Sequence, residues 1–236
     1  MASEPRFLTK FDEHLSRKVF HVLSGTILAV LYAYVVPRRE ATLIALGLGL
    51  SMATLDFVRL RWKWLNELCF RVYGPLMREH EKNEASAQLY YILGMIWAVG
   101  VLPKTIGLQA MLTLAWMDPI AGLFGIKFGR TPWRRIAPKV EELENKTVEG
   151  SLAGFLAAFL AGLLTWTGPW AAFPLEAGLR WPTPLEILVL SLVGAFVAVV
   201  AEAWPSQWDD NARIPFWVGI VVWCAAIITG VPQLFH

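Results

Sequence analysis

The chain has 236 residues, of which 56% are hydrophobic, and a mean hydropathy of +0.48; it is too apolar for an ordinary soluble domain and long enough for several membrane spans. Its formal net charge is only +2, so the composition gives no electrostatic support for a nucleic-acid partner. We therefore expect a single all-α, multi-pass membrane domain over residues 1–236, with the lipid bilayer as its surroundings.

Membrane-spanning helices need roughly 17 to 25 largely apolar residues. The sequence offers seven candidates, a few of them short, so we predict about seven transmembrane helices. In chain order the candidates are 19–36, 41–55, 87–102, 105–126, 151–167, 184–203 and 215–231.

Lysine and arginine concentrate in the arm 1–18, in the segment 59–84 and in the loop 127–150. Positive charge favours the cytoplasmic side of a membrane, so these three segments predict an N-terminus inside and a C-terminus outside. Arg38 and Arg39 oppose this bias but are outnumbered. We expect the active site on the cytoplasmic face, of the cell inner membrane if the protein is bacterial, with 127–150 as its catalytic loop.

The segment 59–84 is too charged to span a membrane, but its apolar residues recur at helical spacing. This pattern predicts an amphipathic helix lying in the membrane interface. At its start, Asp56 and Arg59 have the spacing of an ion pair that closes the second span. We expect Arg78 and Glu81 to lie on a solvated face.

Asp118 lies inside the fourth predicted span, ~13 Å from the cytoplasmic end at a rise of about 1.5 Å per residue. Ionisable groups at such depth are costly and usually line a functional cavity. We expect Pro119 to interrupt the helix, and the alternative role for Asp118 is merely to cap the second half. Gly122 and Gly125 allow either a nucleotide or another helix to approach closely.

A second polar motif, residues 146–151, opens the fifth predicted span. Free N–H groups and the positive end of a helix attract anions there, so we expect it to bind nucleotide phosphates. Thr147 and Glu149 could equally be an ordinary helix cap and a first-turn acid. The expected nucleotide-binding residues are Lys127, Lys139, Lys146, Thr147, Gly150 and Ser151, with Gly122, Gly125 and His21.

Arg17, Lys18 and His21 open the first predicted span on approximately one face of the helix. Basic residues at a cytoplasmic helix end commonly anchor topology, which is the alternative to phosphate binding.

Carboxylates also gather around the last two spans. Glu202 ends the sixth span, and Asp210 and Asn211 lie in the turn before the seventh. Because Mg²⁺ binds one or two carboxylates together with nucleotide oxygens, we expect Asp118, Glu202 and Asp210 to hold it. The alternative is a polar turn that hydrogen-bonds to itself.

In chain order, these motifs resemble those of the CTP-dependent lipid kinases, a family that includes yeast-type diacylglycerol kinase, dolichol kinase and phytol kinase. The resemblance covers nearly the whole chain. It is carried by Arg17-Lys18-x-x-His21, Asp56-x-x-Arg59, Leu76-Met77-Arg78-x-x-Glu81, Asp118-x-x-Ala121-x-x-x-Gly125, Lys146-Thr147-x-Glu149-Gly150-Ser151, and Glu202 followed by Asp210-Asn211-x-x-Ile214-Pro215.

The resemblance implies transfer of the γ-phosphate of CTP, with Mg²⁺, to the hydroxyl of a membrane lipid alcohol. It favours diacylglycerol, while polyprenol and phytol stay open, and it implies that Arg17, Lys18, Asp118 and Gly125 matter to activity. In the resulting scheme the catalytic residues are Asp118, Lys146, Glu149, Arg17 and Lys18, and either Asp118 or Glu149 takes the proton of the acceptor. The expected supporting residues are Asp56, Arg59, Arg78, Glu81 and Asn211.

Two other functions stay open. The motif that begins at Lys146 is shared with phosphatidate cytidylyltransferases, which make a CDP-lipid. A broken fourth helix would also suit a small-anion transporter, although we find no inverted repeat. The sequence sets neither the lipid acceptor nor the oligomeric state.

Overall fold

The computed structural model describes residues 6–74, 77–136, 146–167, 180–204 and 208–231, and no strand occurs among them. The elements are α1 (Arg6–Tyr34), α2 (Arg38–Arg61), α3 (Lys63–Tyr73), the 3-10 turn η2 (Glu79–Lys82), α4 (Ala87–Gly100), α5 (Lys104–Phe128), the 3-10 turn η3 (Trp133–Arg135), α6 (Val148–Thr167), α8 (Pro184–Ala203) and α9 (Asp210–Ile228).

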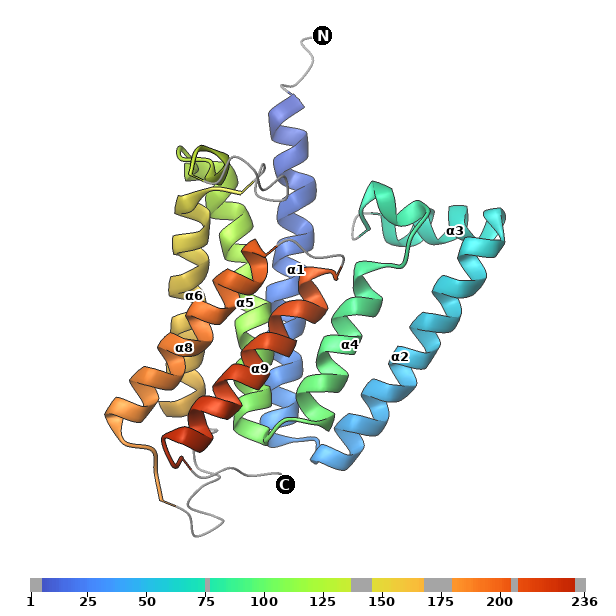
Figure 1. Ribbon diagram of the computed structural model, residues 1–236. Helices are drawn as coiled ribbons and strands as arrows, with labels where there is room; N and C mark the ends of the chain where they lie inside the picture. Colours follow the sequence, from blue (N-terminus) through green and yellow to red (C-terminus); the bar gives the residue numbers. More distant parts are fainter. Residues whose placement is uncertain (1–5, 75–76, 137–145, 168–179, 205–207, 232–236) are drawn as a thin grey trace.

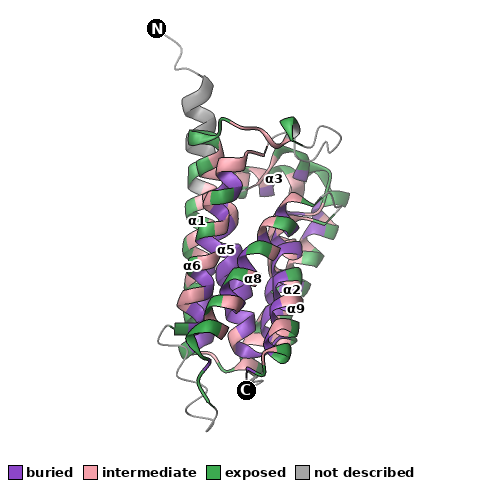
Figure 2. Cartoon of the chain, turned by 60° about the vertical axis from the view of Figure 1, so that its left-hand side comes forward, coloured by how far each residue is buried: buried purple, intermediate pink, exposed green. Residues whose placement is uncertain are grey.

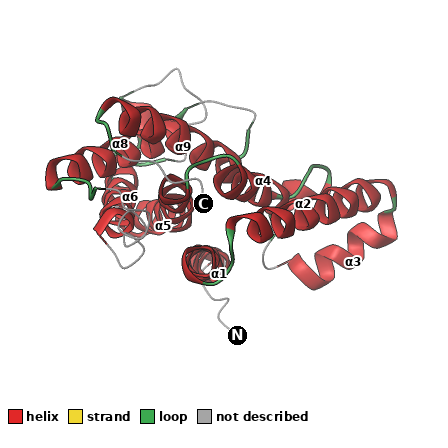
Figure 3. Cartoon of the chain, turned by 90° about the horizontal axis from the view of Figure 1, so that it is seen from below, coloured by secondary structure: helices red, strands yellow, loops and turns green. Residues whose placement is uncertain are grey.

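The long helices run up and down in one bundle, with the start of α1 and the end of α9 at opposite ends of it (Figure 1). We call the end where α5 finishes and α6 begins the upper end, as drawn in Figure 1. Viewed from below, α2, α3 and α4 form one side and α6, α8 and α9 the other, and α1 lies beside α5 (Figure 3).

The core is built around α5, which packs against α1, α4, α6, α8 and α9. Buried residues follow this helix through the middle of the molecule (Figure 2). Gln109 is fully buried and is satisfied on both sides: its Oε1 accepts a hydrogen bond from Trp166 Nε1 at 2.7 Å, and its Nε2 donates to the Leu190 carbonyl at 3.1 Å. Because a buried polar group without partners is costly, these bonds fix α5 against α6 and α8.

Within the described residues, five helices are long and apolar enough to cross a membrane, namely α2, α5, α6, α8 and α9. This confirms the all-α fold and the presence of several apolar helices of spanning length. Among the other predicted spans, α4 has only 14 residues, and α1 joins a charged first half to an apolar second half.

Two expectations about local structure are wrong. α5 continues through Pro119 without a break, because a proline inside a helix removes one backbone hydrogen bond and neighbouring helices hold the rest of α5 in place. The segment 59–84 is not one helix: α2 extends to Arg61, and α3 and η2 follow as separate elements. Arg59 therefore lies on α2, where it is buried rather than turned toward lipid headgroups.

Candidate active site at the upper end of the bundle

Lys18 of α1 and Asp118 of α5 form an ion pair, with 2.7 Å between Nζ and Oδ2. The same Nζ donates to the backbone carbonyl of Asp118 at 3.1 Å. One helical turn further along α5, a Cβ on Gly122 would lie 3.0 Å from both Cε and Nζ of the lysine. The absence of a side chain at position 122 therefore leaves the space that the lysine fills.

Gly125 and Gly150 have a different role, because they let α5 and α6 cross closely. A Cβ on Gly150 would lie 2.7 Å from the Ala121 carbonyl oxygen, and one on Gly125 would lie 3.1 Å from Thr147 Oγ1. Small residues at such a crossing are typical of packed membrane helices. The contacts of Gly125 thus fit the helix-packing alternative, and Gly150 lies at the same crossing.

The carboxylate of Glu149 is held by backbone groups. Its Oε2 accepts hydrogen bonds from the N–H groups of Arg130 and Thr131, both at 3.1 Å. The Val148 N–H donates to the Thr131 carbonyl at 3.0 Å. These bonds fasten the chain that follows α5 to the first turn of α6, which gives Glu149 a structural role.

Thr147 and Ser151 also make local contacts. The Thr147 hydroxyl accepts a hydrogen bond from the Gly150 N–H at 3.2 Å, as an ordinary helix cap does. The Ser151 hydroxyl accepts one from Trp133 Nε1 at 2.9 Å. Of this motif, it is Lys146 that extends toward the carboxylates of other helices.

Lys146 lies among acidic groups of α8 and α9. Its Nζ is 3.4 Å from Glu202 Oε1 and 3.8 Å from Asp210 Oδ2, and it also donates to the Glu202 carbonyl. Arg213 pairs with Asp210 from the other side. Both acids are within electrostatic range of Asp118, so carboxylates of α5, α8 and α9 converge with Lys146 at the upper end.

Arg78 connects the chain before α4 to the start of α9. Its Nη1 lies 3.1 Å from Asp209 Oδ2, and Asp209 caps α9 by accepting a hydrogen bond from the Asn211 N–H at 2.9 Å. Arg17 is close enough for its charge to interact with that of Arg78. Burial, reinforced by Arg78, lowers the pKa of Arg17 from its ordinary value, which still leaves the guanidinium protonated at neutral pH.

The ion pair expected between Asp56 and Arg59 is present, with 2.6 Å between Oδ1 and Nε. The buried guanidinium also donates to the carbonyls of Glu81 and Glu84 at 2.7 and 2.8 Å, and Asp56 accepts from the N–H of Ser86 at 2.8 Å. This network joins α2 to the chain before α4. The expectation that Glu81 lies on a solvated face is wrong, because it is only 1% exposed beside this network.

Two cavities adjoin at the upper end, sharing Arg78 and Ala87 in their walls. The polar cavity encloses about 870 Å³, part of it open to solvent, and lies between the chain before α4, the end of α8 and the start of α9. The inner cavity, between α1, α4, α5 and α9, is smaller: its space of about 610 Å³ also includes open solvent. The polar cavity is lined by Lys146, Glu202, Asp209, Asp210 and Arg213, and the inner cavity by Lys18, His21, Ser24, Tyr91, Asp118 and Asn211.

Mg²⁺ fits the donor groups of the polar cavity only in company with a phosphate. In the part of the chain that the structure describes, no three acidic, histidine or cysteine side chains group closely enough to hold a metal ion. Glu202 Oε2, however, is buried and has no hydrogen-bond partner among the described residues. A hard cation that takes one or two carboxylates and completes its shell with phosphate oxygens and water would satisfy that oxygen.

Two of the expected site residues remain, Lys139 and Lys127. Lys139 lies outside the described residues. Lys127 is exposed, and its ammonium group lies 5.3 Å from the ring centroid of the neighbouring Phe128. Sequence reasoning missed Arg213, although its spacing from Asp210 is that of an intrahelical ion pair, and it missed Tyr91, whose place in an apolar helix gave no signal.

Comparison with known proteins adds family information. The chain matches the model of the cytidylyltransferase family over residues 13–208. It is 33% identical over 220 residues to CTP-dependent diacylglycerol kinase 1 of Saccharomyces cerevisiae, which covers 89% of this chain and 71% of the relative. The proteins of the same name from Eremothecium gossypii and Schizosaccharomyces pombe are 32% and 31% identical, covering 89% and 85% of this chain and 65% and 88% of the relatives. No solved structure matches the chain.

Proposed function

Because the chain belongs to the cytidylyltransferase family and its curated relatives are named CTP-dependent diacylglycerol kinases, we propose that it transfers the γ-phosphate of CTP to the hydroxyl of a membrane lipid, with diacylglycerol as the favoured acceptor. One observation carries this proposal: the polar cavity and the inner cavity meet at Arg78, with Lys146 in one and the Lys18–Asp118 pair in the other.

The polar cavity suits the nucleotide. Lys146, Arg213 and Arg78 bring three cations to its wall, and a polyphosphate needs such cations to neutralise its charge. Glu202 and Asp210 would hold Mg²⁺, which when bound offsets negative charge on the β- and γ-phosphates. The wall also carries the carboxylates of Glu81, Glu84, Glu202, Asp209 and Asp210, so a nucleotide would enter together with its metal ion.

The inner cavity suits the acceptor. Phosphoryl transfer depends mainly on positioning and on charge stabilisation rather than on covalent chemistry by the protein. The lipid hydroxyl would attack the γ-phosphorus and give its proton to Asp118. The bond to the bridging oxygen of the β-phosphate would break, and CDP would leave through the polar cavity. Lys18 and Arg17 would stabilise the charge on the transferred group.

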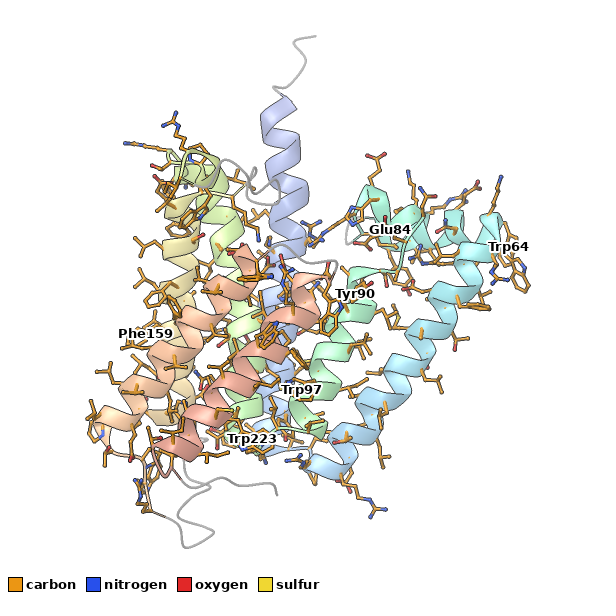
Figure 4. The ribbon with its side chains drawn as sticks, in the orientation of Figure 1. Trp64, Glu84, Tyr90, Trp97, Phe159 and Trp223 are labelled. Atoms are coloured by element: carbon orange, nitrogen blue, oxygen red, sulfur yellow. The ribbon has the colours of Figure 1, made fainter. Side chains whose placement is uncertain are left out.

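The same proposal sets the topology. We place the upper end at the cytoplasm, count α1 and α4 with the five long apolar helices as spans, and lay α3 in the membrane interface. Trp64 supports the last point, because it lies at the outer corner where α2 gives way to α3 and is 64% exposed (Figure 4). Tryptophan at such a position is typical of a membrane interface.

A cytidylyltransferase reaction is the second candidate, favoured by the description of the family model. Purified protein in vesicles containing diacylglycerol or phosphatidic acid, supplied with CTP labelled at the γ- or the α-phosphate, separates the two. A kinase puts the γ-label on diacylglycerol. A cytidylyltransferase puts the α-label on phosphatidic acid and releases the γ-label in pyrophosphate, and that result would overturn the proposal.

The acceptor and the nucleotide can be assigned with the same preparation. We expect diacylglycerol to exceed a polyprenol and phytol as acceptor, and CTP to exceed ATP as donor. Greater phosphorylation of a polyprenol would keep the kinase proposal and reassign its lipid.

A further inference from the structure

The inner cavity lies among apolar helices, yet one of its walls is polar and another faces the outside of the bundle. Phe20 of α1 lines it and is 53% exposed, on the outward face of that helix. α1 packs mainly against α5, and it meets α4 in this cavity through His21 and Tyr91. A lipid in the membrane could therefore enter sideways, past Phe20.

The polar wall consists of three side chains from α1 and α4. His21 and Tyr91 meet edge to face, with ring centroids 5.1 Å apart, and His21 Nε2 is buried without a hydrogen-bond partner among the described residues. The Tyr91 hydroxyl is also buried and makes no hydrogen bond of good geometry within the described chain, although the Ser24 hydroxyl is near it. Unsatisfied buried groups of this kind are costly unless a ligand completes them.

The Tyr91 hydroxyl is also held in a fixed place. It points at Gly25 of α1, where a Cβ would lie only 2.9 Å from the hydroxyl oxygen. A side chain at position 25 would overlap both this hydroxyl and Ala115 of α5, whose Cβ would be 2.5 Å away. The glycine thus leaves the hydroxyl in the cavity, one helical turn beyond His21 and deeper in the bundle than the Lys18–Asp118 pair.

We propose that the inner cavity recognises a glycerolipid by two separate hydrogen-bond sites: His21 Nε2 accepts from the free hydroxyl that will be phosphorylated, and the Tyr91 hydroxyl, beside Ser24, donates to an ester carbonyl of the acyl chains. This inference rests on the proposed kinase function and specifies its acceptor. An isoprenoid alcohol offers the hydroxyl but no carbonyl, so it leaves the Tyr91 donor buried and unpaired.

The consequence is a preference that can be tested with two lipids of nearly equal shape. A 1,2-diacylglycerol and a 1,2-dialkylglycerol of equal chain length share the hydroxyl and both tails, but the ether lipid has no carbonyl. A site built around a hydrogen bond discriminates strongly against an analogue that lacks the partner atom. We expect kcat/KM for the diacyl lipid to exceed that for the dialkyl lipid about tenfold, the effect of one hydrogen bond left unmade.

The experiment measures kcat/KM for both lipids, and KM for CTP, in the wild type and in variants of the full chain. Tyr91→Phe should lower kcat/KM about tenfold for the diacyl lipid only, which removes the preference. His21→Ala should lower it equally for both lipids, because both carry the hydroxyl. Tyr73→Phe, an exposed position on α3, is the matched control and should change neither. KM for CTP should stay unchanged in all three; a raised KM for CTP in His21→Ala would instead favour the nucleotide contact that the sequence predicts for His21 and would overturn the lipid role.

Several outcomes would overturn the inference. Equal wild-type rates with the two lipids would do so, as would a preference that survives in Tyr91→Phe. Ser24→Ala keeps the test open if the tyrosine variant does not purify as a folded protein, since it should also weaken the preference. If wild-type protein phosphorylates no lipid alcohol, the proposed kinase function fails; if it phosphorylates both lipids without preference, only this inference fails.

Discussion

The Lys18 side chain of α1 passes directly over Gly122 to reach the carboxylate of Asp118. Asp118 and Gly122 are four residues apart, so they lie on one face of α5. The two charged side chains are only 11% and 18% exposed. A pair so deep is stable only when both charges are satisfied, which makes the space above position 122 a requirement of the site.

Gly122→Ala tests that relationship. The new Cβ would lie 3.0 Å from Cε and Nζ of Lys18, so the ammonium group must move away from Asp118. We expect kinase activity to fall about tenfold or more, the effect of losing a charge-assisted contact. Stability should fall as well, because a buried carboxylate that loses its partner costs more than the roughly 0.5–1 kcal/mol by which alanine is favoured over glycine in a helix.

Gly47→Ala is the control for this variant, because nothing lies within 4 Å of a Cβ at that position on α2. It should keep full activity and show a small gain in thermal midpoint, because alanine is favoured over glycine in a helix. If Gly122→Ala keeps wild-type activity, the space above this glycine has no catalytic importance.

Asp118→Asn should abolish phosphoryl transfer while leaving a folded protein, because the amide keeps the shape of the carboxylate but not its charge. We expect a loss of at least about 100-fold in kcat, within the range attributed to a positioned catalytic side chain. Incorporation of γ-label into diacylglycerol measures it, and gel filtration reports folding. Glu40 has an exposed carboxylate in the first turn of α2, and the control variant Glu40→Gln should remain fully active. An active Asp118→Asn enzyme would remove Asp118 from the mechanism.

Lys146→Ala should weaken nucleotide binding, because Lys146 is a cation in the wall of the polar cavity and reaches Glu202 and Asp210. We expect KM for CTP to rise about 10- to 100-fold, the effect of one charge-assisted contact, with little change in KM for diacylglycerol. Steady-state kinetics with each substrate varied in turn give both constants. Lys63→Ala, on the exposed first turn of α3, should change neither. A rise in KM for the lipid alone would place Lys146 on the acceptor side.

The sequence predicted the helices well because a membrane helix must be both long and apolar. It predicted local breaks poorly. Pro119 predicts a break in the helix, yet α5 continues past it. The neighbouring helices hold in place a backbone that would otherwise bend at the proline. Arg59 reads as part of an interfacial helix, yet its bonds to carbonyls more than 20 residues away bury it, and no local pattern reports such distant partners.

For the candidate site, the sequence indicated which residue types to consider, but it did not indicate which of them contact one another. Lys146, Glu202 and Asp210 stand out in sequence because charges at helix ends are rare and costly, and the structure brings them together. Glu149 stands out for the same reason but is bound to backbone N–H groups. Tyr91 gives no signal in the sequence, because the residues that it faces, His21 and Gly25, lie on another helix, α1.

Glu202→Gln should raise the Mg²⁺ concentration needed for half-maximal activity, because Glu202 Oε2 is a buried carboxylate oxygen without a hydrogen-bond partner among the described residues. We expect a shift of about tenfold, as for the loss of one charged ligand. Chelation with EDTA should abolish the activity of both enzymes, and added Mg²⁺ should restore it. Glu79→Gln, a carboxylate that is 94% exposed on η2, is the control. An unchanged Mg²⁺ titration would show that Glu202 does not meet the metal.

Arg59→Lys should destabilise the fold without acting on the chemistry. The guanidinium donates to Asp56, Asn66 and the carbonyls of Glu81 and Glu84, and an ammonium group cannot reach four acceptors in that planar arrangement. We expect a loss of about 2–4 kcal/mol, since a buried charged network loses part of its hydrogen bonds. Thermal unfolding in detergent measures it, with Arg61→Lys at the exposed end of α2 as the control. At a temperature where both proteins are folded, KM for CTP should match the wild type; a raised KM with an unchanged thermal midpoint would instead make Arg59 a nucleotide contact.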